Sequence, residues 1–81
     1  MASLLIVDDD PTFGRFLQNL LRSEGHDCRL NASLSEMRDA FASSLPDVVL
    51  LDVHLPDGNA LSALPWIAER PHAPEIIVIT G

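Results

Sequence analysis

The sequence predicts an α/β domain in which a parallel β-sheet carries helices on both faces. Three short runs are almost entirely apolar, at residues 3–7, 48–51 and 75–79. Continuous apolarity, in place of an alternating pattern, is typical of parallel strands buried between two layers. Segments with helical spacing of apolar residues lie between these runs. Strands that alternate with helices along a chain form a parallel sheet.

The first helix is expected directly after the first apolar run. Asp10 followed by Pro11 is typical of an N-cap and a first helical residue. Gly25 is typical of a left-handed cap at the end of a helix. The apolar residues between them recur at helical spacing, and we expect Phe13 and Phe16 to face the core.

Two further helices and an edge strand complete the pattern. Residues 26–31 alternate between polar and apolar, which is typical of a strand with one wet face. Ser33 and Glu36 match a capping box at the start of a second helix. A third helix is expected to start near Asn59, and Pro65 is expected to kink it.

The order of elements, βαβαβαβ, restricts the topology of the sheet. Right-handed crossovers leave few arrangements. The flavodoxin-like strand order 2-1-3-4 places the mixed second strand at an edge and the first and third strands at the centre. The fold class is therefore α/β, with a flavodoxin-like parallel sheet.

Each of the three apolar strands is followed by a polar residue. Asp8 and Asp9 follow the first, Asp52 the second and Thr80 the third. In an open parallel sheet, ligands bind at the carboxyl ends of the strands, where the strand order reverses. That point lies between the strands that carry Asp8, Asp9 and Asp52. We therefore expect these three carboxylates to converge.

Converging carboxylates repel one another unless a cation lies between them. Ligands that are all oxygen favour Mg²⁺, which keeps several waters and accepts phosphate oxygens. The same arrangement is what phosphoryl transfer to a carboxylate requires, because the nucleophile must be ionised and the charge on the phosphoryl oxygens neutralised. A hydroxyl such as that of Thr80 can then hydrogen-bond a bound phosphoryl oxygen.

Three motifs resemble the receiver domains of two-component response regulators. They are the segments at residues 6–11, 50–58 and 77–81. The resemblance implies that Asp52 is the phosphoacceptor and that a sensor histidine kinase is the donor. It also implies that Asp9 ligates Mg²⁺ directly and that Asp8 acts through water or as a second ligand. The backbone carbonyl of His54 would supply another metal oxygen.

The resemblance extends to the end of the chain and to an output domain. It implies that Thr80 is the switch hydroxyl and that Gly81 is the small residue that leaves access to the acceptor. Residues 55–59 and 78–81 are most similar to regulators fused to ATPase activators of the alternative sigma factor, or to simple DNA-binding output domains. We therefore expect a transcriptional output domain outside this chain.

The chain departs from the family in one respect. Receivers continue with a further helix, a strand that ends in a lysine and a last helix, whereas this sequence contains no lysine. Residues 1–81 are therefore interpreted as the N-terminal portion of a receiver without the catalytic lysine. The fourth strand is then an exposed apolar edge, and we expect the chain to self-associate as a homodimer or larger assembly.

Charge and composition exclude several classes of function. The net charge of −7 argues against direct binding to nucleic acid or to anionic lipid. No apolar run approaches the roughly 18 residues of a membrane span. Cys28 has no partner for a disulfide and no signal-peptide pattern precedes it, which favours a cytoplasmic location.

Two other interpretations remain open. A haloacid-dehalogenase-like phosphatase also uses a strand-end aspartate, and Asp8 has the acid Asp10 two residues later and Thr12 beyond it. Asp52 does not fit that enzyme, because its second following residue is His54. The other alternative is a flavodoxin-like interaction module without phosphotransfer. We expect a signalling phosphoacceptor and not an enzyme with turnover.

Overall fold

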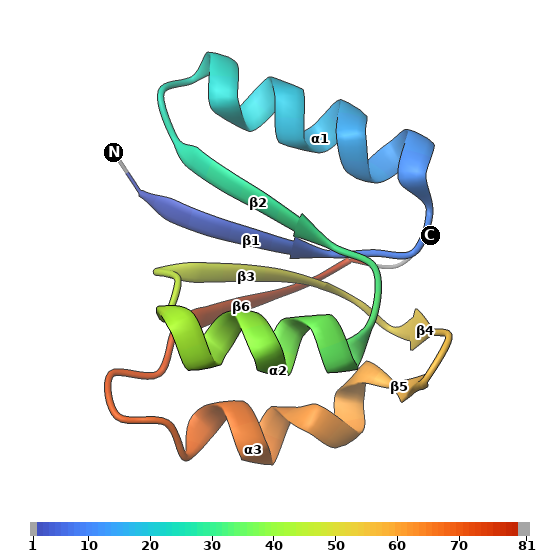
Figure 1. Cartoon of the computed structure of the whole chain (residues 1–81), viewed down its shortest axis with the longest axis vertical. Coiled ribbons are helices and arrows are strands. Elements are labelled where there is room, and N and C mark those ends of the chain that lie inside the picture. The colour runs from blue at the N-terminus through green and yellow to red at the C-terminus, as the bar shows by residue number, and fades with distance from the viewer. Residues whose placement is uncertain (1, 80–81) are drawn as a thin grey trace.

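The computed structural model describes residues 2–79 as a four-stranded parallel sheet with helices on both faces (Figure 1). The strands are β1 (Ser3–Val7), β2 (Asp27–Asn31), β3 (Val48–Asp52) and β6 (Glu75–Ile79). Their order in the sheet is β2-β1-β3-β6. This confirms the predicted flavodoxin-like order 2-1-3-4, since β6 is the fourth long strand along the chain.

Helix α1 (Pro11–Ser23) lies on one face of the sheet, over β1 and β2. Its start is the predicted cap, because the Asp10 carboxylate accepts hydrogen bonds from the amides of Thr12 and Phe13. Gly25 follows the helix with a φ of +90°, the left-handed conformation expected there.

The expectation that Phe13 and Phe16 face the core is wrong. Their side chains are 43% and 64% exposed. The cause is the rotation of α1, which turns Gly14 toward β2 together with two leucines of the helix that pack on the sheet. A Cβ atom on Gly14 would lie 2.9 Å from Leu30 Cδ1, so the helix backbone approaches the sheet at this residue. The phenylalanines are thereby directed away from it.

Helix α2 (Leu34–Ser43) lies on the opposite face and begins with the predicted capping box. The Ser33 hydroxyl oxygen accepts a hydrogen bond from the Glu36 amide at 3.1 Å. The Glu36 carboxylate accepts from the Ser33 hydroxyl and from the amide of Ala32, both at 3.3 Å. The reciprocal backbone bond is therefore made one residue earlier than in the usual box.

The third helical segment consists of two parts, the 3₁₀ helix η1 (Ala60–Ala63) and α3 (Leu64–Ala68). Asn59 caps η1 through its side chain, as its position in the sequence predicted. Pro65 was expected inside the helix, but the structure places it at the start of α3, directly after η1. Pro65 lies in the first turn of α3, where a missing N–H removes no bond within the helix.

The connection from β3 to η1 forms a small antiparallel hairpin of β4 (His54–Leu55) and β5 (Gly58–Asn59). Its turn contains the sequence Pro-Asp-Gly, which is typical of turns. Gly58 has a φ of +146°, a conformation that residues with side chains rarely adopt. Leu55 is buried in the core between the sheet and α2.

The core lies mainly between the sheet and the α2–α3 layer. Alternate residues of β1 and β3 pack there on α2 and α3, and the Phe41 and Trp66 rings stack with their centroids 5.3 Å apart. On the α1 face of the described chain, the buried hydrophobic side chains are those of Leu4, Ile6 and Cys28. No helix within residues 2–79 is long and apolar enough to cross a membrane.

Strand β6 lies at the edge of the sheet, as predicted. Its Ile77 and Val78 side chains are 51% and 42% exposed. The apolar composition of this strand therefore does not correspond to complete burial in the described chain.

Candidate metal centre

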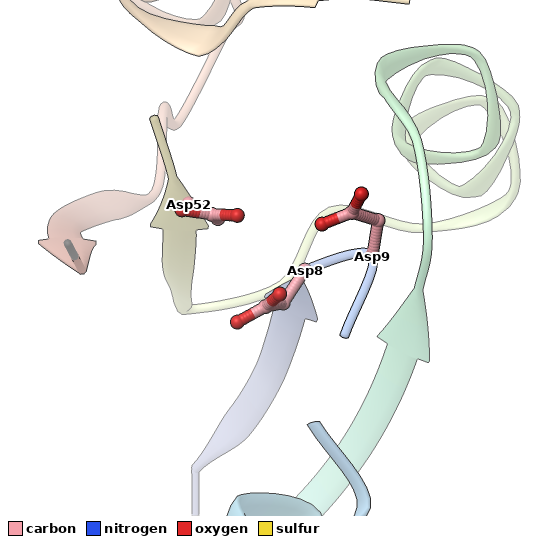
Figure 2. Close-up of side chains that lie close together, drawn as sticks. All are labelled: Asp8, Asp9 and Asp52. Atoms are coloured by element: carbon pink, nitrogen blue, oxygen red, sulfur yellow. The ribbon is translucent and has the colours of Figure 1, made fainter. Parts of the chain in front are cut away.

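The carboxylates of Asp8, Asp9 and Asp52 converge at the carboxyl ends of two neighbouring strands (Figure 2). Each offers one oxygen, and these three oxygens all lie within 4.8 Å of one another. Asp8 and Asp9 follow β1 directly, and Asp52 ends β3. The two strands pair in parallel with Val7 opposite Leu51, so their ends lie side by side. The predicted convergence is confirmed.

The three acids differ in burial. Asp8 is only 7% exposed, Asp52 is partly buried and Asp9 is exposed. The amide of Asp8 donates to the Asn31 carbonyl of β2, and its Oδ1 accepts from the Asp10 amide at 2.9 Å. The bond to Asn31 fixes the backbone of Asp8, and the Asp10 amide orients its side chain.

Burial raises the pKa of the Asp8 carboxyl above its ordinary value. The hydrogen bond from the Asp10 amide acts in the opposite direction, and the neighbouring negative charges, that of Asp52 foremost, add to the increase. A cation in contact with these oxygens would replace repulsion by attraction. Binding of a cation at this site would therefore be favourable, because it would relieve the repulsion between the carboxylates.

A cavity of about 490 Å³ opens above the three carboxylates. The residues that line it are Asp8, Asp9, Asp10, Phe13, Asp52, His54 and Ile79. Oxygen ligands on one side and open space on the other suit Mg²⁺, which retains several waters and binds phosphate oxygens. The donor set of this chain therefore fits the predicted ion.

His54 lies on the wall of the cavity, in β4. The Ala60 amide donates to the Val53 carbonyl at 2.8 Å, immediately outside the His54–Asn59 pair of the hairpin. This makes His54 and Asn59 a non-hydrogen-bonded pair of the antiparallel ladder. The carbonyl of His54 is consequently not used by the hairpin, and its role as a metal ligand remains a prediction.

Phe13 lines the cavity, although the sequence analysis did not predict it as a site residue. Its aromatic ring was expected in the core, but it lies in the first turn of α1 at the cavity wall. The signal available in the sequence is the Asp10 cap, because a helix that starts directly after Asp8 and Asp9 must present its first turn near them.

The two other predicted site residues, Thr80 and Gly81, lie outside the described residues. Ile79, the last residue of β6, lines the cavity. Asp10 was predicted as a helix cap, and the hydrogen bonds to Thr12 and Phe13 confirm it.

A flavodoxin-like sheet with an acidic cavity at its strand ends is the arrangement expected of a receiver domain, and sequence comparison identifies the same class of signalling domain. Residues 4–81 match the response regulator receiver domain family. The chain belongs to this family.

Its relatives include regulators of transcription. It is 33% identical over 78 residues to the TorCAD operon transcriptional regulatory protein TorR of Escherichia coli (strain K12). The aligned region covers 96% of this chain and 34% of TorR. It is 33% identical over 80 residues to the DNA-binding transcriptional regulator NtrC of Proteus hauseri, covering 99% of this chain and 17% of NtrC. The chain thus spans about a third of TorR and about a sixth of NtrC.

Solved receiver structures share the fold. The MaeR response regulator bound to beryllium trifluoride superposes with a TM-score of 0.88 at 30% identity, over 100% of this chain and 68% of that one. The receiver domain of the PhyR response regulator of Erythrobacter litoralis gives a TM-score of 0.85 at 32% identity, over 98% of this chain and 62% of that one.

Proposed function

We propose that this chain accepts a phosphoryl group on Asp52 from a sensor histidine kinase, with Mg²⁺ bound beside it. The observation that carries the proposal is the convergence of the Asp8, Asp9 and Asp52 oxygens within 4.8 Å, at the strand ends of a receiver fold. A carboxylate at this position is next to the metal ligands and open to the cavity, as an acceptor must be.

The metal ligands follow from burial and from the free donor atoms. Asp9 is exposed and would hold Mg²⁺ directly, together with an oxygen of Asp52. Asp8 is buried and keeps one oxygen on the Asp10 amide, so it contributes its other oxygen, directly or through a bound water. The His54 carbonyl, which the hairpin leaves free, supplies a further oxygen.

Phosphoryl transfer then proceeds by in-line attack of Asp52. An oxygen of its carboxylate forms a bond to phosphorus while the phosphorus–nitrogen bond of the phosphohistidine breaks, and the imidazole leaves with the bonding electron pair. The bound metal supplies neutralisation of the charge on the phosphoryl oxygens. In this proposal the Thr80 hydroxyl donates a hydrogen bond to one of these oxygens. Gly81, which has no side chain, leaves the phosphodonor access to Asp52.

The proposed partners are the kinase and an output domain of the same protein. TorR and NtrC are transcriptional regulators by name, which supports a DNA-binding or sigma-54-type ATPase output. The acidity of this chain favours control of such a domain over direct contact with DNA. The chain is modified in the reaction and is not a catalyst with turnover. The buried Cys28 thiol fits the reducing cytoplasm in which we propose that the exchange occurs.

Self-association of the 81-residue chain is part of the same proposal. The unpaired edge of β6 is a template for another strand, and Ile77 and Val78 are exposed along it. A homodimer that pairs through β6 would place a second strand beside both side chains, which point to opposite faces of the sheet.

The test is the site of phosphorylation. The chain is incubated with a small phosphodonor and Mg²⁺, and the acyl phosphate is trapped and located by peptide mass spectrometry. We expect one phosphoryl group on Asp52, none in Asp52→Asn and none with a chelator. Asp39→Asn, which changes an exposed acid on α2, is the matched control and should be labelled normally. A label on Asp8 would support the haloacid-dehalogenase-like alternative, and absence of Mg²⁺ binding the flavodoxin-like interaction module.

A further inference from the structure

The hairpin that follows the acceptor strand is attached to α2 by a single carboxylate. Asp57, in the turn between β4 and β5, accepts the Leu34 amide on Oδ1 and the Ser35 amide on Oδ2, both at 2.9 Å. These bonds join residues that are 22 and 23 positions apart in the chain. Figure 1 shows the hairpin beside the first turn of α2.

Asp57 completes the N-terminus of a helix to which it does not belong. The first amides of a helix have no partner within it. In α2 the Glu36 amide bonds to the Ser33 hydroxyl, and the Leu34 and Ser35 amides bond to Asp57. These hydrogen bonds hold the pKa of the Asp57 carboxyl below its ordinary value, so the carboxylate is ionised at neutral pH. A negative charge at this end of a helix is also favoured by the helix dipole.

The hairpin has few other attachments. Strands β4 and β5 pair only with each other among the described strands and are not part of the main sheet. Leu55 is buried beneath the hairpin, and a Cβ atom on Gly58 would lie 3.5 Å from Leu34 Cδ1. The Ala60 amide bond to the Val53 carbonyl closes the base of the hairpin, and Leu55 and the two bonds of Asp57 fasten the rest of it, His54 included.

We propose that Asp57 is a positioning residue of the metal site, which holds the His54 carbonyl at the cavity wall by fastening the β4–β5 hairpin to the start of α2. This inference rests on the proposed function, in which that carbonyl is a ligand of Mg²⁺. It adds a residue that touches neither the metal nor the phosphoryl group. Asp57 acts through the geometry of the hairpin, in the way that residues behind a metal ligand determine its orientation.

The experiment compares Mg²⁺ binding by the full chain and three variants, with magnesium chloride as the only ligand. In Asp57→Ala we expect the dissociation constant to rise about tenfold, the effect typical of losing a residue that orients a ligand. Amide hydrogen exchange should show that Leu34 and Ser35 lose protection in the same variant. Asp57→Asn retains one carbonyl oxygen as an acceptor, so its dissociation constant for Mg²⁺ should lie between those of the wild type and Asp57→Ala.

Ser33→Ala is the matched control. It removes the other cap of α2, the bond to the Glu36 amide, without releasing the hairpin. We expect its affinity for Mg²⁺ to stay within about twofold of the wild type, because the bonds that position the His54 carbonyl are unchanged. Equal weakening in Ser33→Ala and Asp57→Ala would assign the effect to helix stability and overturn the inference.

The remaining outcomes separate the two proposals. If the wild type binds Mg²⁺ and Asp57→Ala binds it equally well although Leu34 and Ser35 have lost protection, the positioning role is wrong and the metal site stands. If the wild type binds no Mg²⁺, the proposed function fails and the inference fails with it. Should Asp57→Ala not fold, Asp57→Asn with unchanged affinity and reduced protection is the result that contradicts the positioning role.

Discussion

The two faces of the sheet are covered to different extents. On the α2–α3 face, Leu5, Val7, Val49 and Leu51 are completely buried beneath the helices. On the α1 face, Ile77, which pairs with Leu50 and so shares its face, is half exposed. Because burial of apolar surface is the main stabilising contribution, we conclude that the α2–α3 face supplies most of the stability. The exposed apolar side chains of β6, Ile77 and Val78, are the ones on which the proposal of self-association depends.

The largest expected effect tests this difference directly. Met37 is completely buried on α2, and Met37→Ala should lower the free energy of unfolding by about 2–5 kcal/mol through lost contacts and a cavity. Ile77→Ala, on the α1 face of the sheet, truncates a side chain that is 51% exposed and should lower it by no more than about 1 kcal/mol. Urea denaturation of the two variants and the wild type measures both changes in the free energy of unfolding. Similar losses would show that the two faces contribute alike.

The second prediction concerns self-association through β6. Ile77→Lys places a charge on the exposed edge and should weaken association about tenfold, equivalent to about 1.4 kcal/mol. Sedimentation velocity over a concentration series measures the change. Leu61→Lys, at a side chain of η1 that is 48% exposed, is the control and should leave association unchanged. A wild-type chain that is monomeric at high micromolar concentration would make the self-association proposal wrong.

The third prediction concerns Asp8, at the rim between the two faces. Its pKa is raised by burial and by neighbouring charges, so its contribution to stability is present at low pH and is lost as the pH rises through the folded-state pKa. Asp8→Asn removes the charge but keeps an oxygen for the Asp10 amide. Without metal at neutral pH it should be more stable by about 1 kcal/mol, or roughly 4–8 °C in Tm.

Added Mg²⁺ should reverse the order, because the wild type gains stability from binding and Asp8→Asn gains less. Thermal unfolding with and without Mg²⁺ measures both effects. A lower Tm for Asp8→Asn in the absence of metal would contradict the account of repulsion at the site.

The smallest effect concerns acid and the attachment of α2. The pKa of Asp57 is lowered by its bonds to the Leu34 and Ser35 amides. Its contribution is therefore present above the unfolded pKa of about 3.9 and is lost as the pH falls through the lower folded-state value. Between about pH 6 and pH 3, Asp57→Asn should lose less stability than the wild type. Equal losses, measured by urea denaturation at the two pH values, would show that the bonds do not contribute.

The sequence predicted the parts of the fold that depend on pattern and chain order. Apolar runs and caps located the four long strands, and crossover rules determined their order. Asp8, Asp9 and Asp52 could be placed together because each follows a strand, and parallel strands end at one rim. The roles of Thr80 and Gly81 remain predictions.

The remaining features depended on how one element rotates or shifts against another. Phe13 and Phe16 show helical spacing, but spacing does not say which side of α1 approaches the sheet, and the close contact of Gly14 with Leu30 determines this. Asp57 belongs to a turn motif in the sequence. Its bonds to Leu34 and Ser35 exist because the fold brings that turn to the start of α2.

By itself, then, the sequence determined the four long strands, the first two helices, the strand order and the convergence of the three acids, because local pattern and chain connectivity are sufficient for these. Only the tertiary structure decided which aromatic residues are exposed, where Pro65 lies in its helix and what Asp57 contacts. These features depend on packing between distant segments, whose sub-ångström fit is not encoded in any single stretch of the chain.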